Sequence, residues 1–139
     1  MADLTIGSNG ISIVFANDAD IRDIKAAEAI TAGQAVYVTT AGKAGVADAN
    51  AAGKQQFRGI ALKSVAAGEI CPVLTEGYLS GYDLSGVAYD GAVYLSDTAG
   101  KLADGVGTMT VNCGRVTNLA DADLTKILFV KADWLRAWS

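Results

Sequence analysis

A short motif that occurs twice constrains the fold of this chain more than any other feature. Gly33-Gln34-Ala35-Val36-Tyr37-Val38 recurs as Gly91-Ala92-Val93-Tyr94-Leu95, and each copy is followed by Ala-Gly-Lys, at residues 41–43 and 99–101. Valine and tyrosine favour strands, and a glycine between two apolar runs is typical of a turn. The repeat therefore predicts two similar β units. Each has a strand, a Gly-Lys turn and a returning strand, and each buries one face against the other.

The rest of the chain fits the same architecture. Gly59-Ile60-Ala61 has a weaker counterpart in Gly114-Arg115-Val116. Two copies are too few for a solenoid, which needs three or more repeats, whereas short strands at regular spacing are typical of sandwiches and barrels. We therefore expect an all-β fold, a small β-barrel with pseudo-duplicated strand-turn-strand units. Pro72 lacks an N–H, which predicts an edge strand or a bulge at residues 70–74.

Length, composition and charge narrow the class of protein. A chain of 139 residues is long enough for one domain, and 51% hydrophobic residues with 7% aromatic ones predict a lean aliphatic core. The net charge is −4 and the basic residues are scattered, which argues against nucleic acid as a partner. Apolar runs such as residues 127–130 are far shorter than the ~20 residues of a membrane span. With no basic or apolar leader, we expect a soluble protein made without export.

The residue types needed for most catalytic chemistry are missing or scattered. The chain has no histidine, and Cys71 and Cys113 are too far apart in sequence for the usual zinc-ligand spacing. We expect two buried free thiols, with a single disulfide as the alternative. Four aspartates are spaced by seven residues, which suggests turns rather than a calcium loop: Asp83, Asp90, Asp97 and Asp104. The sequence thus predicts no catalytic residues, no metal site and no cofactor.

The first 25 residues differ from the rest. Their apolar residues alternate as in a strand, interrupted by the Gly-Ser-Asn-Gly of residues 7–10, and are Leu4, Ile6, Ile11, Ile13 and Phe15. An acidic stretch follows them. We therefore divide the chain into residues 1–25, an extended N-terminal arm or a first hairpin, and residues 26–139, the β-barrel domain.

Two groups of aromatic residues are candidates for contacts with other molecules. Tyr78, Tyr82 and Tyr89 lie near several glycines, and Trp134 and Trp138 lie within the last six residues. Tyrosine and tryptophan are enriched in protein interfaces, so we interpret all five as subunit or partner contacts. The tyrosines also fit a carbohydrate- or surface-binding module, and the tryptophans also fit docking onto the chain's own barrel.

The motifs from residue 26 onward resemble the capsid decoration, or cement, proteins of tailed phages, a small family long described as a domain of unknown function. The resemblance is carried by residues 32–37, 57–62, 68–77, 88–95, 100–102, 114–116 and 127–130. These are strand and turn motifs without invariant chemistry. They cover most of the chain after the first 25 residues.

The resemblance implies a compact β-barrel or β-tulip-like domain that forms a homotrimer on the outer surface of a phage head. Such a protein assembles in the host cytoplasm, becomes part of the virion, and stabilises the expanded shell by clamping the major capsid protein. An N-terminal arm, here residues 4–15, adds a strand to the capsid protein. The alternative is the carbohydrate- or surface-binding β-module. A biotinyl- or lipoyl-type carrier using Lys43 or Lys101 fits less well, because Ala-Gly-Lys matches neither carrier pattern.

Overall fold

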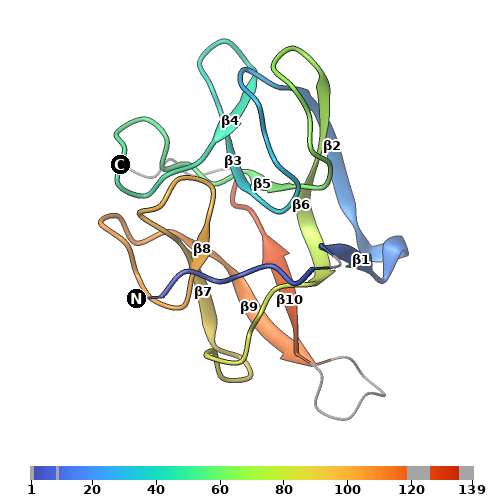
Figure 1. The fold of residues 1–139 in the computed structure, drawn as a ribbon, viewed down its shortest axis with the longest axis vertical. Helices are drawn as coiled ribbons and strands as arrows, with labels where there is room; N and C mark the ends of the chain where they lie inside the picture. Colours follow the sequence, from blue (N-terminus) through green and yellow to red (C-terminus); the bar gives the residue numbers. More distant parts are fainter. Residues whose placement is uncertain (1, 9, 119–125, 135–139) are drawn as a thin grey trace.

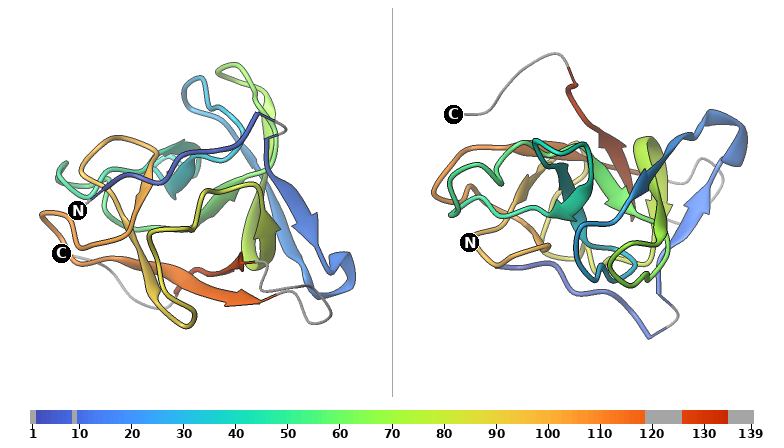
Figure 2. Two further views of the ribbon diagram at one scale, coloured as in Figure 1. Left: turned by 60° about the horizontal axis from the view of Figure 1, so that its bottom comes forward. Right: turned by 90° about the horizontal axis from the view of Figure 1, so that it is seen from above.

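One antiparallel sheet of ten strands, curled into an open barrel, forms the fold (Figure 1). The computed structural model describes residues 2–8, 10–118 and 126–134. Among these, the single helical piece is one turn of 3₁₀ helix, η1 (Ala16–Asp18). The predicted all-β, barrel-like fold class is therefore confirmed. Figure 2 shows the sheet curling round its interior, with the N-terminal segment running across the opening.

The two predicted units are present, and their strands follow the same order. In the first unit they are β3 (Ala35–Val38), β4 (Ala44–Val46), β5 (Gly59–Ala61) and β6 (Ile70–Ser80). In the second they are β7 (Ala92–Leu95), β8 (Leu102–Ala103), β9 (Asn112–Asn118) and β10 (Lys126–Lys131). The sheet order is β4-β3-β5-β6-β10-β9-β7-β8. The two units therefore have equivalent strand orders that run in opposite directions from the β6–β10 pair at the centre.

The register of the strands repeats as well. Val36 of β3 lies opposite Gly59 of β5, and Val93 of β7 lies opposite Gly114 of β9. The repeated motif therefore marks two hairpins that pair with their third strands in the same way. An added Cβ at Gly114 would fall on the carbonyl oxygen of Phe129, so the close approach of β9 and β10 requires glycine there.

The N-terminal strands β1 (Ser12–Val14) and β2 (Asp20–Lys25) both pair with β6. They do not pair with each other in the sheet, so they form no two-stranded hairpin of their own. Ahead of them, the Leu4 backbone N–H donates to the Leu102 carbonyl at 2.8 Å, and Ile6 forms an isolated bridge with Tyr82. Residues 2–8 and 10–25 thus lie along the domain and hydrogen-bond to it at several points.

The edge-or-bulge prediction for Pro72 is wrong. β6 has strands on both sides, and the sheet irregularity between β2 and β6 lies at Asp20 and Ile21 instead. The Pro72 carbonyl accepts a hydrogen bond from the Leu62 N–H at 2.9 Å. In an antiparallel strand the N and the C=O of one residue point to the same side. The position of the missing N–H therefore faces the segment that follows the end of β5.

Two hydrophobic cores lie on opposite faces of the sheet. The main core is shared by both units and includes Leu74, Leu95 and Leu128. The smaller core belongs to the first unit and includes Val36, Val73 and Cys71. A layer made of residues 26–30 and 65–69 covers the smaller core, and its two segments are joined by backbone hydrogen bonds. The first unit is thus covered on both faces.

The polar residues considered in the sequence have local structural roles. Cys71 and Cys113 are buried free thiols, so the chain has no disulfide between them. Asp97 accepts hydrogen bonds from both the N–H and the hydroxyl of Thr108, and Asp83 accepts from Ser85. The Asp83 contact, two residues long, is the turn chemistry expected of aspartate, whereas Asp97 contacts a residue eleven positions away.

Candidate binding surface

Four aromatic side chains gather on the outer side of the sheet, the side away from the main core. We call this surface the outer aromatic face and define it by Phe15, Tyr78, Phe129 and Trp134. The Phe15 and Tyr78 rings meet edge to face with centroids 5.4 Å apart, and the Tyr78 and Phe129 centroids are 5.0 Å apart. Aromatic pairs at such distances stabilise each other beyond the area they bury.

Strand register explains why these rings share one side. Val14, Tyr78, Phe129 and Arg115 lie opposite one another across β1, β6, β10 and β9. Residues directly opposite in a sheet point to the same face. Because Leu128 enters the main core, its neighbour Phe129 must point outward. The apolar row therefore belongs to the surface of the sheet.

A groove of about 580 Å³ opens beside Phe129. It is lined by residues at the ends of β9 and β10 and in the segment that follows: Asn112, Gly114, Arg115, Phe129, Lys131, Ala132, Asp133 and Trp134. The lining is mainly apolar and also includes charged residues. Such a hollow can receive an apolar side chain of another molecule.

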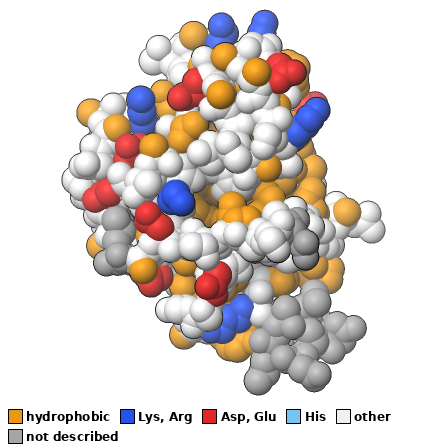
Figure 3. All heavy atoms as spheres, viewed as in Figure 1, with side chains coloured by type: hydrophobic (Ala, Val, Ile, Leu, Met, Phe, Trp, Pro, Cys, Tyr) orange, Lys and Arg blue, Asp and Glu red, His pale blue; other side chains and the backbone are white. Residues whose placement is uncertain are grey.

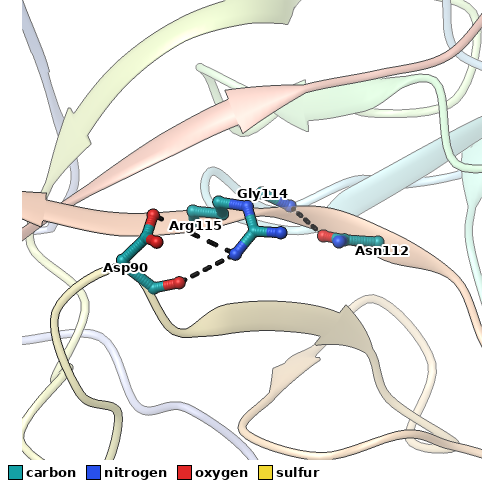
Figure 4. Close-up of polar contacts among 4 residues, drawn as sticks. All are labelled: Asp90, Asn112, Gly114 and Arg115. Carbon is teal, nitrogen blue, oxygen red and sulfur yellow. Dashed lines mark hydrogen bonds and ion pairs between the residues drawn. The ribbon is translucent and has the colours of Figure 1, made fainter.

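Arg115 borders the groove and is held loosely (Figure 4). Its guanidinium donates to the Asp90 carbonyl at 2.8 Å and lies 4.0 Å from the Asp90 carboxylate. The two side chains are 54% and 92% exposed, so this ion pair contributes little to stability. Asn112 accepts a hydrogen bond from the Gly114 N–H at 3.0 Å. The Arg115 side chain remains accessible to a partner.

Trp134 is 37% exposed and lies beside two arginines. The guanidinium carbons of Arg22 and Arg58 lie 5.1 and 5.2 Å from its ring centroid, within the range of cation–π contacts. Arg58 also donates to the Asp133 carbonyl and to Gln56 Oε1. Burial lowers the pKa of Arg58, and the nearby Asp133 charge partly offsets this. The tryptophan thus connects β2, the approach to β5 and the end of β10.

The predicted arm residues divide between the core and the surface. Leu4 is buried in the main core, and Ile11 and Ile13 pack against it. Ile6 and Phe15 are 40% and 44% exposed. Leu4, Ile11 and Ile13 are therefore committed to the domain's own packing in this structure, whereas Phe15 lies on the outer aromatic face.

The three tyrosines do not form one platform. Tyr82 is buried, and its hydroxyl donates to the Gly33 carbonyl at 2.6 Å, so the structure corrects its assignment to a surface. Burial raises the pKa of Tyr82. Tyr89 is exposed with Lys126 above its ring, and Tyr78 belongs to the outer aromatic face. Trp138 lies outside the described residues.

Phe129 was missed in the sequence because it lies in a continuous apolar run. Such a run is typical of a strand buried on both faces. Arg22, Arg58 and Arg115 were missed because nothing local connects them. Register and the contacts of Trp134 bring them to one side of the sheet.

Charged side chains of both signs are spread over the view in Figure 3, without a large patch of one sign. No helix among the described residues is long and apolar enough to cross a membrane. In comparisons with known proteins, no family model matches the chain and no curated protein matches it. The arrangement of the outer aromatic face is therefore the main guide to function.

Proposed function

We propose that this protein is a capsid decoration protein that forms a homotrimer on the outer surface of a phage head. It stabilises the expanded shell by clamping major capsid proteins. The motifs that resemble the decoration family supply the strands and turns of the two units. Contact with other proteins, rather than covalent chemistry, is the activity that this surface supports.

The outer aromatic face is the observation that carries the proposal. Phe15 and Trp134 are exposed on it. Tyr78 packs against both Phe15 and Phe129 and so extends the apolar surface from β1 to β10. A grouped aromatic surface with arginines beside it is typical of a protein interface. Single exposed apolar residues would need no such explanation.

The proposal restricts the role of the N-terminal segment. Burying a leucine side chain stabilises a protein by about 1.5–3 kcal/mol, so releasing Leu4 to reach a capsid protein has a cost of that order. Ile6 and Phe15 are accessible without that release. The first contact of this segment with a capsid protein is therefore assigned to Ile6, which lies away from the outer aromatic face beside Tyr82.

Binding to shells tests the proposal. Shells assembled from the major capsid protein encoded in the same genome are incubated with the protein before and after expansion, then sedimented. We expect saturable binding to expanded shells, little binding to unexpanded ones, and greater resistance of the decorated shells to heat. Equal binding to both forms, or to neither, would contradict the proposal.

A carbohydrate-binding function has less support. Tyr82, one of the three tyrosines that suggested it, is buried and hydrogen-bonded to Gly33. Tyr78 and Tyr89 contact different partners, Phe129 and Lys126. The alternative would gain support from glycan-array binding that is lost when Tyr89 is replaced by alanine.

A further inference from the structure

The two units differ in what covers their outer sides. In the first unit, residues 26–30 and 65–69 cover Val36 and Val73 and form the smaller core. In the second unit, the side away from the main core carries Phe129 and Arg115 and borders the groove. Ile127, on the same side of β10, is buried, but among the described residues no pair of segments like 26–30 and 65–69 lies over Phe129, which is partly exposed.

The residue types on this uncovered side are those of a subunit interface. The chain has four arginines, and the three that the structure describes, Arg22, Arg58 and Arg115, all border the outer aromatic face or its groove. Of the seven lysines, Lys131 lines the groove. Interface centres are enriched in aromatic residues and arginine and depleted in lysine. Placement of the arginines thus separates this face from the rest of the surface.

The charges on this face balance, whereas those of the whole chain do not. Four basic and four acidic residues border it: Arg22, Arg58, Arg115, Lys131, Asp20, Glu76, Asp90 and Asp133. The net charge of −4 therefore belongs to the remainder of the chain. A face without net charge can meet a second copy of itself without like-charge repulsion.

From these observations we propose that the outer aromatic face is where one copy of this chain contacts a second copy. The inference rests on the proposed function, because it assigns the contact within the expected homotrimer. The second copy takes the place that residues 26–30 and 65–69 occupy on the first unit. It covers Phe129 and the groove beside it.

A ring of three subunits requires two different surfaces that fit together. This face has both: a hollow beside Phe129 and, at the corner between β1 and β2, the exposed Phe15. Phe15 has a positive φ of 58°, which turns the chain sharply at that corner. Insertion of Phe15 from one subunit into the groove of the next is the contact that we assign within the homotrimer.

Two variants test the contact with little risk to the fold. Phe15→Asn removes the aromatic ring and keeps a residue type that tolerates positive φ. Arg115→Glu reverses a charge on a side chain that is 54% exposed. Val106→Ser and Lys43→Glu are the matched controls, since Val106 is 51% exposed and Lys43 lies in the open turn of the first hairpin.

Light scattering after size-exclusion chromatography, from 1 to 100 µM, gives the mass of each variant relative to the 14.2 kDa chain. We expect the unmodified protein and both controls to be trimers. Phe15→Asn and Arg115→Glu should each weaken the assembly by about tenfold or more in concentration. Far-ultraviolet circular dichroism establishes that each variant is folded.

The outcomes separate this inference from the proposed function. Trimers that persist unchanged in both folded variants overturn the inference, as does an unmodified protein that is monomeric at 100 µM. If the variants stay trimeric but lose binding to expanded shells, the face contacts capsid protein, and the inference fails while the proposed function stands. If the protein is a trimer that both variants weaken but does not bind expanded shells, the inference stands and the proposed function fails.

Discussion

The hairpins β3–β4 and β7–β8 contain the same motif but have different surroundings. The turn of the second hairpin is docked: Gly100 is buried, its N–H donates to the Ala47 carbonyl at 2.7 Å, and its carbonyl accepts from the Ala35 N–H at 2.9 Å. The turn of the first hairpin is exposed, and an added Cβ at Gly42 would meet nothing within 4 Å. The same local sequence therefore forms one open turn and one that joins the two units.

The valines of the motif show a second difference. Val36 packs in the smaller core, whereas Val93 packs in the main core. Ala35 and Val36 are both fully buried, because the first unit is covered on both faces, but Ala92 is only half-buried. The motif thus determines which strands pair. Which core buries each of its residues depends on the segments that cover the sheet.

Replacing the paired glycines is the strongest test of equivalence between the units. An added Cβ would meet the Leu74 carbonyl oxygen at Gly59 and the Phe129 carbonyl oxygen at Gly114. Backbone atoms cannot move aside cheaply, so Gly59→Ala and Gly114→Ala should each lower the free energy of unfolding by about 3 kcal/mol. Urea denaturation measures the change.

Gly68→Ala is the control for this pair, since Gly68 has a positive φ of 89° and open space around it. It should cost about 1 kcal/mol, the ordinary penalty for positive φ. If only one of the two strand glycines is costly to replace, the two units are not equivalent at their third strands.

Replacing the turn glycines tests the difference between the hairpins. Gly42 and Gly100 have nearly equal φ values of 80° and 77°, so alanine has the same backbone penalty at both. At Gly100 the new Cβ would also lie 2.8 Å from Val46 Cγ1. We expect a loss of about 1 kcal/mol for Gly42→Ala and about 2 kcal/mol for Gly100→Ala.

Thermal or urea unfolding at pH 7 measures this pair side by side. Because the backbone penalty is shared, the difference between the two variants isolates the docking of the second turn. Equal losses would mean that this docking adds nothing to stability.

The two thiols allow a smaller test, one that compares the cores. Burial raises the pKa of Cys113 well above its ordinary value of 9.0, and it also raises that of Cys71, with Asp23 adding to the effect. Above pH 9 the two thiols therefore stay protonated in the folded state, whereas they lose their protons in the unfolded state. Stability is full well below pH 9 and falls as the pH rises through 9, by about 1.4 kcal/mol at pH 10 for Cys113.

Urea midpoints at pH 8 and pH 10 measure this fall in the unmodified protein and in Cys113→Ala and Cys71→Ala. The dependence on pH should shrink more in Cys113→Ala, because that thiol lies in the core shared by both units. A larger change in Cys71→Ala would reverse the expected ranking of the two cores.

The strands could be predicted because their signals are local. Val36 and Tyr37, or Val93 and Tyr94, favour a strand wherever they occur, and glycine marks the turn that follows. The pairing of β1 and β2 with β6 could not be predicted, because those partners are 45 to 68 residues apart in sequence and alternation does not identify a partner.

The candidate surface was only partly predictable for the same reason. Phe15, Tyr78 and Trp134 were identified as contact residues, but nothing in the sequence joined them, and Phe129 was hidden in an apolar run. Tyr82 was misplaced because a tyrosine beside glycines looks the same whether its hydroxyl meets water or, as here, the Gly33 carbonyl.

β6 has a further consequence for how the domain opens. It pairs with β1, β2, β5 and β10, and its side chains enter both cores. Local openings need few broken contacts, whereas separating β6 from its neighbours exposes both cores at once. Backbone amides of β6 should therefore exchange with solvent only through global unfolding. The domain then behaves as a single cooperative unit, in which a disturbance at the N-terminal strands reaches both repeated units together.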